Sequence, residues 1–133
     1  RMPEISRYAS AVSAIPAVRA FLLEMQKSLA RKNSVVMDGR DIGTVIIPDA
    51  DLKIFLTASN ETRARRRTLE LQAKGVDAKY EDVLFDMIER DKNDKDRDIA
   101  PAVPADDAII FDNSAMSVEE SVKEIVRLLN EHK

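Results

Sequence analysis

Three short apolar segments, separated by longer stretches with helical periodicity, limit most strongly what this chain can fold into. They cover residues 34–38, 52–57 and 108–112. Apolar runs of this length are typical of strands that are buried on both faces, as in parallel sheets. Two of the three are followed by clear helical patterns, which is the order of elements in α/β layered folds. The sequence therefore predicts an α/β fold with a mostly parallel sheet.

The intervening stretches place apolar residues at intervals of three and four, which predicts helices. The predicted helices cover residues 5–32, 61–74, 80–91 and 118–130. Pro16 predicts a break in the first, because proline removes a backbone donor and disfavours helix at the residue before it. Gly75 closes the second, and Ser117 with Glu120 fits the capping box that starts the last. Residues 45–47 could be extended or form a short turn.

Composition excludes several kinds of chemistry. The 133 residues contain no cysteine, which rules out disulfides, zinc–thiolate sites and thiol catalysis. The one histidine is His132, next to the end, which argues against a histidine-based triad or a metal site. The net charge of −3 disfavours nucleic-acid binding over the whole surface. No apolar run approaches the ~20 residues of a membrane span, and no signal peptide is visible, so we expect a cytoplasmic protein with no membrane partner.

A charged loop with two glycines follows the first predicted strand. Residues 38–44 read DGRDIGT and lie at the carboxyl end of that strand, where open α/β sheets bind ligands. Arg40 offers a fork of donors to a phosphate, and Asp41 offers a carboxylate to an amine. Gly39 and Gly43 let a ligand approach the backbone. The same residues also fit an ordinary turn with an internal ion pair, and both interpretations stand at this point.

Four arginines without a lysine open the helix predicted over residues 61–74. They are Arg63, Arg65, Arg66 and Arg67. Arginine matches phosphate geometry with two parallel hydrogen bonds. Helical spacing puts Arg63, Arg66 and Arg67 on one face and points Arg65 elsewhere. The alternative is a solvated helix face, the more usual role of a charge run.

Residues 89–98 form a dense run of alternating charge, ERDKNDKDRD. If this run is helical, Arg90, Asp94 and Arg97 fall on one side, which suits a phosphate together with ribose hydroxyls. If it is not, its composition fits a flexible solvated loop. Near the Pro16 break, Arg19 is free to point into a cleft, whereas Ser10 fits a helix surface or a cap as well as a ligand contact.

Taken together, these pieces closely resemble the bacterial cytidylate kinase family. The matching segments are PEISRYASAVSAIPAVRAFLLEMQ, VVMDGRDIGTVIIPDADLKIFLTAS, ETRARRRTLELQAKG and ERDKNDKDRDIAPAVPADDAIIFDNSAMSVEE. They run in order through essentially the whole chain. The resemblance implies a P-loop nucleoside monophosphate kinase-like α/β/α fold with three layers and a parallel sheet. It also implies phosphoryl transfer from ATP, with Mg²⁺, to CMP or dCMP, giving CDP or dCDP.

The resemblance further implies that part of the family's fold is missing here. Family members begin with a strand, a P-loop, a helix and a monophosphate-binding insert, and this sequence contains no GxxxxGK[ST] motif. We expect residues 1–133 to form a single partial domain with a lid region at about 63–98. Its sheet would have a gap between the strands at 35–38 and 52–57. We expect this fragment to be inactive alone and to self-associate through exposed strand edges, whereas the parent protein is expected to be a monomer.

By position, the resemblance assigns the cytosine edge to Ser10, Arg19 and Asp41. The chemistry agrees, because Asp41 can accept from the exocyclic amine and Arg19 can donate to ring acceptors. Uracil has a carbonyl where cytosine has the amine, so it would leave Asp41 facing an acceptor.

The resemblance assigns the phosphates and ribose to the charged motifs. Arg40 and Arg97 match clamps on the acceptor phosphate, and Arg90 and Asp94 match contacts near the ribose and phosphates. The lid residues that would close over ATP are Arg63, Arg66 and Arg67. Among all of these, we expect Arg40, Arg66 and Arg97 to act in catalysis, by supplying donors to the transferring group. No spacing typical of metal ligands is present.

Two other functions remain open on the sequence. The chain could belong to a kinase of the same fold with a different small acceptor, in which case Arg19 and Asp41 would have no joint role. It could instead be a non-catalytic fragment that binds nucleotides or nucleic acid through its arginine-rich helix. A steep salt dependence of polynucleotide binding would mark the latter, and the net charge of −3 argues against it.

Overall fold

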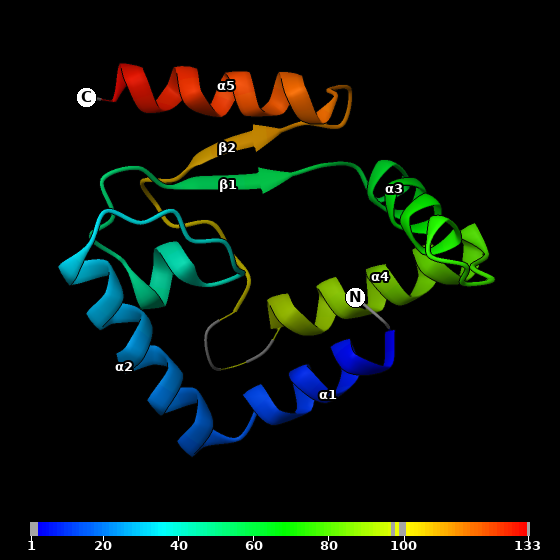
Figure 1. The fold of residues 1–133 in the computed structure, drawn as a ribbon, viewed down its shortest axis with the longest axis horizontal. Coiled ribbons are helices and arrows are strands. Elements are labelled where there is room, and N and C mark those ends of the chain that lie inside the picture. The colour runs from blue at the N-terminus through cyan, green and yellow to red at the C-terminus, as the bar shows by residue number, and fades with distance from the viewer. Residues whose placement is uncertain (1–2, 97, 99–100, 133) are drawn as a thin grey trace.

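The computed structural model describes residues 3–96, 98 and 101–132, apart from the side chains at positions 3, 4, 6, 7 and 10. The helices are α1 (Pro3–Ser13), α2 (Pro16–Lys32), α3 (Asn60–Ala73), α4 (Tyr80–Asp96) and α5 (Val118–Glu131), and a π-helical turn, η1, spans Ile42–Ile46. The strands are β1 (Ile54–Thr57) and β2 (Ile109–Asp112) (Figure 1). No helix in this described part of the chain is long and apolar enough to cross a membrane.

The sheet of the described residues has two strands, β1 and β2, which pair in parallel as predicted. Their register sets Ile54 opposite Ile109 and Thr57 opposite Asp112. The prediction of a strand at residues 34–38 is wrong, because these residues form no ladder. Val36 is fully exposed, with 100% of its surface accessible. An apolar run becomes a strand only when a neighbouring strand satisfies its backbone groups, and no described strand lies beside this one.

Local signals placed most of the helix ends correctly. Pro16 stands at the start of α2, and Gly75 adopts a φ of 77° after α3, a conformation that side chains with a Cβ disfavour. The capping box is complete, because the Glu120 amide donates to Ser117 Oγ at 3.2 Å and the Ser117 amide donates to Glu120 Oε2 at 2.7 Å. The short segment left open at residues 45–47 belongs largely to η1.

The predicted end of the fourth helix is wrong, since α4 continues from residue 91 to Asp96. The charged run therefore continues the helix instead of forming a loop up to that residue. This run contains neither proline nor glycine to stop the helix, and charged residues four apart can support it. The extension places Arg90 and Asp94 one turn apart on the same helix.

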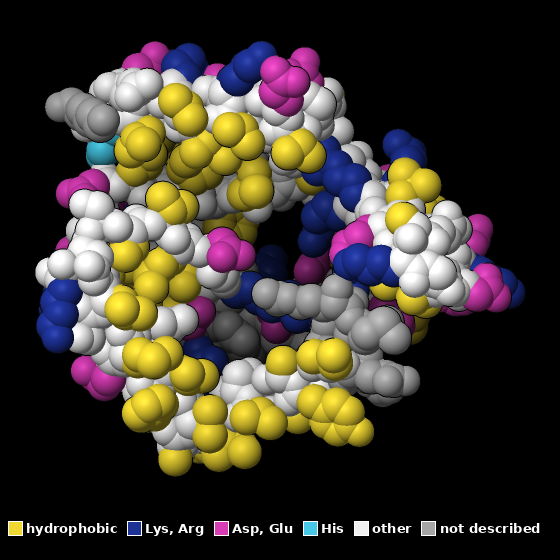
Figure 2. Space-filling view, viewed as in Figure 1, with side chains coloured by type: hydrophobic (Ala, Val, Ile, Leu, Met, Phe, Trp, Pro, Cys, Tyr) yellow, Lys and Arg dark blue, Asp and Glu magenta, His cyan; other side chains and the backbone are white. Residues whose placement is uncertain are grey.

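Burial is shallow throughout the described residues. The best buried apolar side chains are Ile46, Ala58, Ala64, Leu71 and Phe111, and no large side chain is fully buried. The accessible surface is 10022 Å², whereas a compact protein of this mass exposes about 7,000 Å². Figure 2 shows apolar side chains across the visible face, around a central hollow edged by charged side chains. The elements thus surround a space that they do not fill.

Candidate functional site

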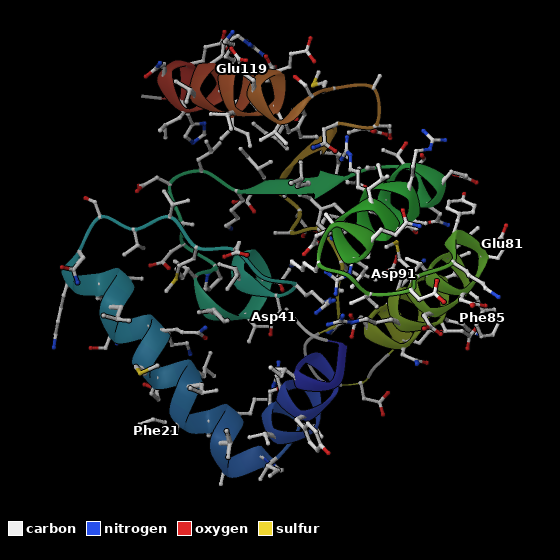
Figure 3. The ribbon with its side chains drawn as sticks, turned by 45° about the vertical axis from the view of Figure 1, so that its right-hand side comes forward. Phe21, Asp41, Glu81, Phe85, Asp91 and Glu119 are labelled. Carbon is white, nitrogen blue, oxygen red and sulfur yellow. The ribbon has the colours of Figure 1, made fainter. Side chains whose placement is uncertain are left out.

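An ion pair joins the start of α2 to the residue before η1. Arg19 Nη2 lies 2.8 Å from Asp41 Oδ2, and the Asp41 side chain is only 14% exposed. Arg19 reaches this position because α2 begins at Pro16, which leaves Arg19 in the first turn. Figure 3 shows Asp41 beside η1, toward the middle of the molecule. The two residues that were assigned to one edge of a base are therefore in contact, although 22 positions separate them.

A second cluster joins the same loop to the end of α4. Arg40 Nε lies 2.5 Å from Asp94 Oδ2, and Arg90 Nε lies 4.0 Å from the same oxygen. The Asp94 side chain is mostly buried, at 17% exposed. The Asp94 carbonyl also accepts the amide of Ala102 at 2.8 Å, which ties the end of α4 to the returning chain. The structure thus brings together Arg40, Arg90 and Asp94.

Two of the predicted site residues fall outside the description. Arg97 lies outside the described residues, and so does the Ser10 side chain, whose backbone belongs to α1. Their roles stay predictions.

The three arginines assigned to the ATP lid each contact a different part of the molecule. Arg63 pairs with Asp91 of α4 and donates to Asn60 Oδ1 at 2.7 Å. Arg66 donates to Asn113 Oδ1 at 3.0 Å and to two backbone carbonyls that follow β2, those of Asn113 and Met116. They do not converge on one point in this structure, so their shared role stays a prediction.

The third arginine of this set stays on its own helix. Arg67 and Lys74 both contact the Glu70 carboxylate, at 2.8 and 2.5 Å. Hydrogen bonds from Lys74, and then from Arg67, lower the pKa of Glu70 from 4.5 to about 2. Arg67 is therefore ion-paired within α3 in this structure.

The glycines of the 38–44 loop have a packing role that sequence reasoning did not foresee. A Cβ at Gly39 would lie 2.8 Å from Ile42 Cγ1, and one at Gly43 would lie 3.3 Å from Lys53 Cδ. The Lys53 side chain is 7% exposed, and its Nζ donates to both carboxylate oxygens of Asp107 at 2.8 Å. These hydrogen bonds lower the pKa of Asp107. A lysine inside the apolar run at 52–57 was the signal that could have revealed the Lys53–Asp107 ion pair.

Among the described residues, no three acidic or histidine side chains gather in a way that could hold a metal ion. The carboxylates of the site are instead taken up by arginines, as in the Arg19–Asp41 and Arg40–Asp94 pairs.

Comparison with known proteins decides the family. The model of the cytidylate kinase family matches residues 1–131. The chain belongs to the cytidylate kinase family. The cytidylate kinase of Fervidobacterium nodosum is 50% identical over 131 residues, and that of Desulfitobacterium hafniense is 51% identical over 131 residues. Each alignment covers 98% of this chain, but 60% and 56% of the relative.

The cytidylate kinase of Pseudomonas aeruginosa is 50% identical over 127 residues, which cover 96% of this chain and 56% of the relative. The chain thus spans less than two thirds of the length of the cytidylate kinases that it matches. Family membership confirms the resemblance and the P-loop nucleoside monophosphate kinase fold. A two-stranded parallel sheet agrees with an incomplete form of that fold.

Proposed function

We propose that this chain carries the acceptor-nucleotide site of an enzyme that transfers a phosphoryl group from ATP to CMP or dCMP, giving CDP or dCDP. The observation that carries the proposal is the pair of Arg19 and Asp41, held 2.8 Å apart at a mostly shielded position. A carboxylate beside a guanidinium presents an acceptor and donors side by side. The cytosine edge has the complement, with an exocyclic amine next to ring acceptors.

The phosphate of the acceptor would bind next to this pair. Arg40 directly precedes Asp41, so a base at Asp41 sets its phosphate within reach of the Arg40 fork. Arg90 would add positive charge, as would Arg97 by the family resemblance, and Asp94 would accept from a ribose hydroxyl. Arginines in these places would hold the acceptor oxygen in line for transfer and neutralise the charge that moves between oxygens.

The ATP side of the reaction rests on fewer residues. Arg63, Arg66 and Arg67 on α3 would face the donor phosphates once the lid closes and excludes water. Mg²⁺, arriving with ATP, would neutralise part of the phosphate charge. Because the sequence holds no P-loop motif, we propose that these 133 residues alone have no kinase activity. CMP-dependent consumption of ATP, in a sample free of any longer enzyme, would contradict this.

The base readout is tested by comparing CMP with UMP. We expect the 133-residue chain to bind CMP, and to bind UMP more weakly by on the order of a hundredfold or more, because uracil leaves Asp41 facing a carbonyl. The Asp41→Asn variant should lose most of this discrimination, since its amide can donate to uracil. Asp49→Asn, an exposed change in the turn after η1, is the matched control. Isothermal titration calorimetry provides the measurement.

Equal affinity of the wild-type chain for CMP and UMP would contradict the proposed base readout. It would favour a kinase of the same fold with a different small acceptor, in which Arg19 and Asp41 form only an internal ion pair. Loss of discrimination in the Asp49→Asn control would also count against the proposal, because the effect would then follow net charge and not the site.

A further inference from the structure

Two carboxylates near the end of α4 hold arginines from two other elements. Asp91 pairs with Arg63 of α3, and Asp94 pairs with Arg40 of the loop before η1. Since they are three positions apart, Asp91 and Asp94 lie on one face of α4. Figure 3 shows Asp91 where α4 faces α3. The end of α4 therefore places two carboxylates against two arginines, one on α3 and one in the loop before η1.

The contact at Arg40 occupies part of the guanidinium that a phosphate would use. Asp94 Oδ2 lies 2.5 Å from Arg40 Nε, which makes the two groups a close ion pair. Arg40 is 44% exposed, so an anion from solvent can reach its remaining donors, whereas Asp94 is 17% exposed. A carboxylate and a phosphate on one guanidinium would bring two anions together, and their repulsion opposes binding of both at once.

We propose that Asp94 is a built-in competitor for the phosphate group that binds Arg40. Binding of the phosphate and release of Asp94 from Arg40 are then one event. A dianionic phosphate can win this exchange, because it carries more charge than a carboxylate and fits the guanidinium fork with two hydrogen bonds. The identity of the ligand as a nucleoside monophosphate rests on the proposed function, whereas the competition requires only a phosphate group.

The exchange also links the phosphate to the position of α4. Asp94 lies in the last turn of α4, and its carbonyl accepts the Ala102 amide at 2.8 Å. Release of the side chain removes the link between α4 and the 38–44 loop. Arg90, whose Nε lies 4.0 Å from the same carboxylate oxygen, remains as a partner of the Asp94 side chain within α4. An empty site thus keeps α4 tied to the loop, and an occupied site frees it.

The first test titrates inorganic phosphate into the full 133-residue chain by calorimetry. Asp94→Asn should tighten phosphate binding roughly three- to tenfold relative to the wild type, because the competitor is lost. Asp96→Asn is the matched control, an exposed aspartate of the same helix that changes the net charge equally. The gain should vanish in an Arg40→Ala background, where the contested guanidinium is gone.

Asp94→Asn binding phosphate no more tightly than Asp96→Asn would overturn the proposal, and so would the absence of measurable phosphate binding in both variants. A gain that persists without Arg40 would overturn it as well. These readouts separate competition from a merely structural ion pair, because loss of a structural pair weakens binding or leaves it unchanged.

A second measurement uses only the wild-type chain, so it does not depend on any variant folding. Phosphate should shift the backbone amide NMR signals of Arg40 and of the Asp94 and Ala102 pair with one common dissociation constant. Fixed signals at Asp94 and Ala102, while those of Arg40 move, would overturn the coupling. A chain that discriminates CMP from UMP but shows no gain in Asp94→Asn would keep the proposed function and remove this proposal. A chain that shows the gain in Asp94→Asn but does not discriminate CMP from UMP would keep this proposal and remove the proposed base readout.

Discussion

The α3–α4 pair and the α1–α2 pair are built from similar helices but differ in how much they bury. In α3, Ala64 is fully buried, and Thr68 and Leu71 are almost so. No residue of α2 is buried, and Phe21 there is 70% exposed. Figure 3 shows Phe21 pointing away from the ribbon, to the outside. The comparison teaches that α3 buries one face where the Arg63–Asp91 ion pair links it to α4, whereas α2 buries none of its residues.

The largest effect expected from this contrast is self-association. The chain leaves apolar side chains uncovered on α1 and α2, and β1 has one described neighbour, β2. Unpaired strand edges and apolar faces associate. We expect sedimentation velocity of the 133-residue chain at micromolar concentration to give species larger than a monomer. Phe21→Asp in α2 and Leu56→Lys in β1 should each shift the distribution toward the monomer.

A matched control for self-association is Glu61→Lys, a charge change on exposed α3 that should leave the distribution unchanged. A clean monomer with cooperative unfolding would contradict the prediction, and would mean that the exposed apolar residues of α1 and α2 are tolerated in water.

A smaller effect separates the two regions by stability. Leu71→Ala in α3 should lower the free energy of unfolding by about 2–4 kcal/mol, because Leu71 is 7% exposed and its removal leaves a cavity. Leu69→Ala on the same helix, 60% exposed, and Phe21→Ala in α2 should each change it by less than about 0.5 kcal/mol. Urea unfolding followed by circular dichroism measures all three. A large loss at Phe21 under conditions where the chain is monomeric would contradict the exposure of α2.

The smallest effect is the pH dependence at the end of α3. The pKa of Glu70 is lowered from 4.5 to about 2 by hydrogen bonds from Lys74 and Arg67. Its stabilising contribution is therefore fully present above pH 4.5 and is lost as the pH falls from 4.5 toward 2. Wild type and Glu70→Gln should differ in unfolding midpoint at pH 6 and converge near pH 2.

The Glu70 difference should be small and should shrink in high salt, because the group is at the surface. Glu89→Gln, an exposed change on α4, is the control for net charge. A difference between wild type and Glu70→Gln that stays constant from pH 6 to pH 2 would contradict the assignment.

Much of the candidate site could be named from the sequence, and less of its geometry. Arg19, Arg40, Asp41, Arg90 and Asp94 were all singled out, and the structure joins them in two clusters. The particular pairing of Arg40 with Asp94 was not foreseen, because it joins residues 54 positions apart. The Lys53–Asp107 contact was missed for the same reason. No local pattern encodes which charges meet across the fold.

The sequence by itself determined the local features: the break at Pro16, the turn at Gly75 and the capping box of α5. Each depends on the dihedral preference or hydrogen bonding of a few neighbouring residues. Tertiary structure alone decided that residues 34–38 form no strand, how far the apolar stripes are covered, and which carboxylate holds each arginine. A strand needs a partner, burial needs a facing surface, and an ion pair needs both charges, so each depends on distant parts of the chain.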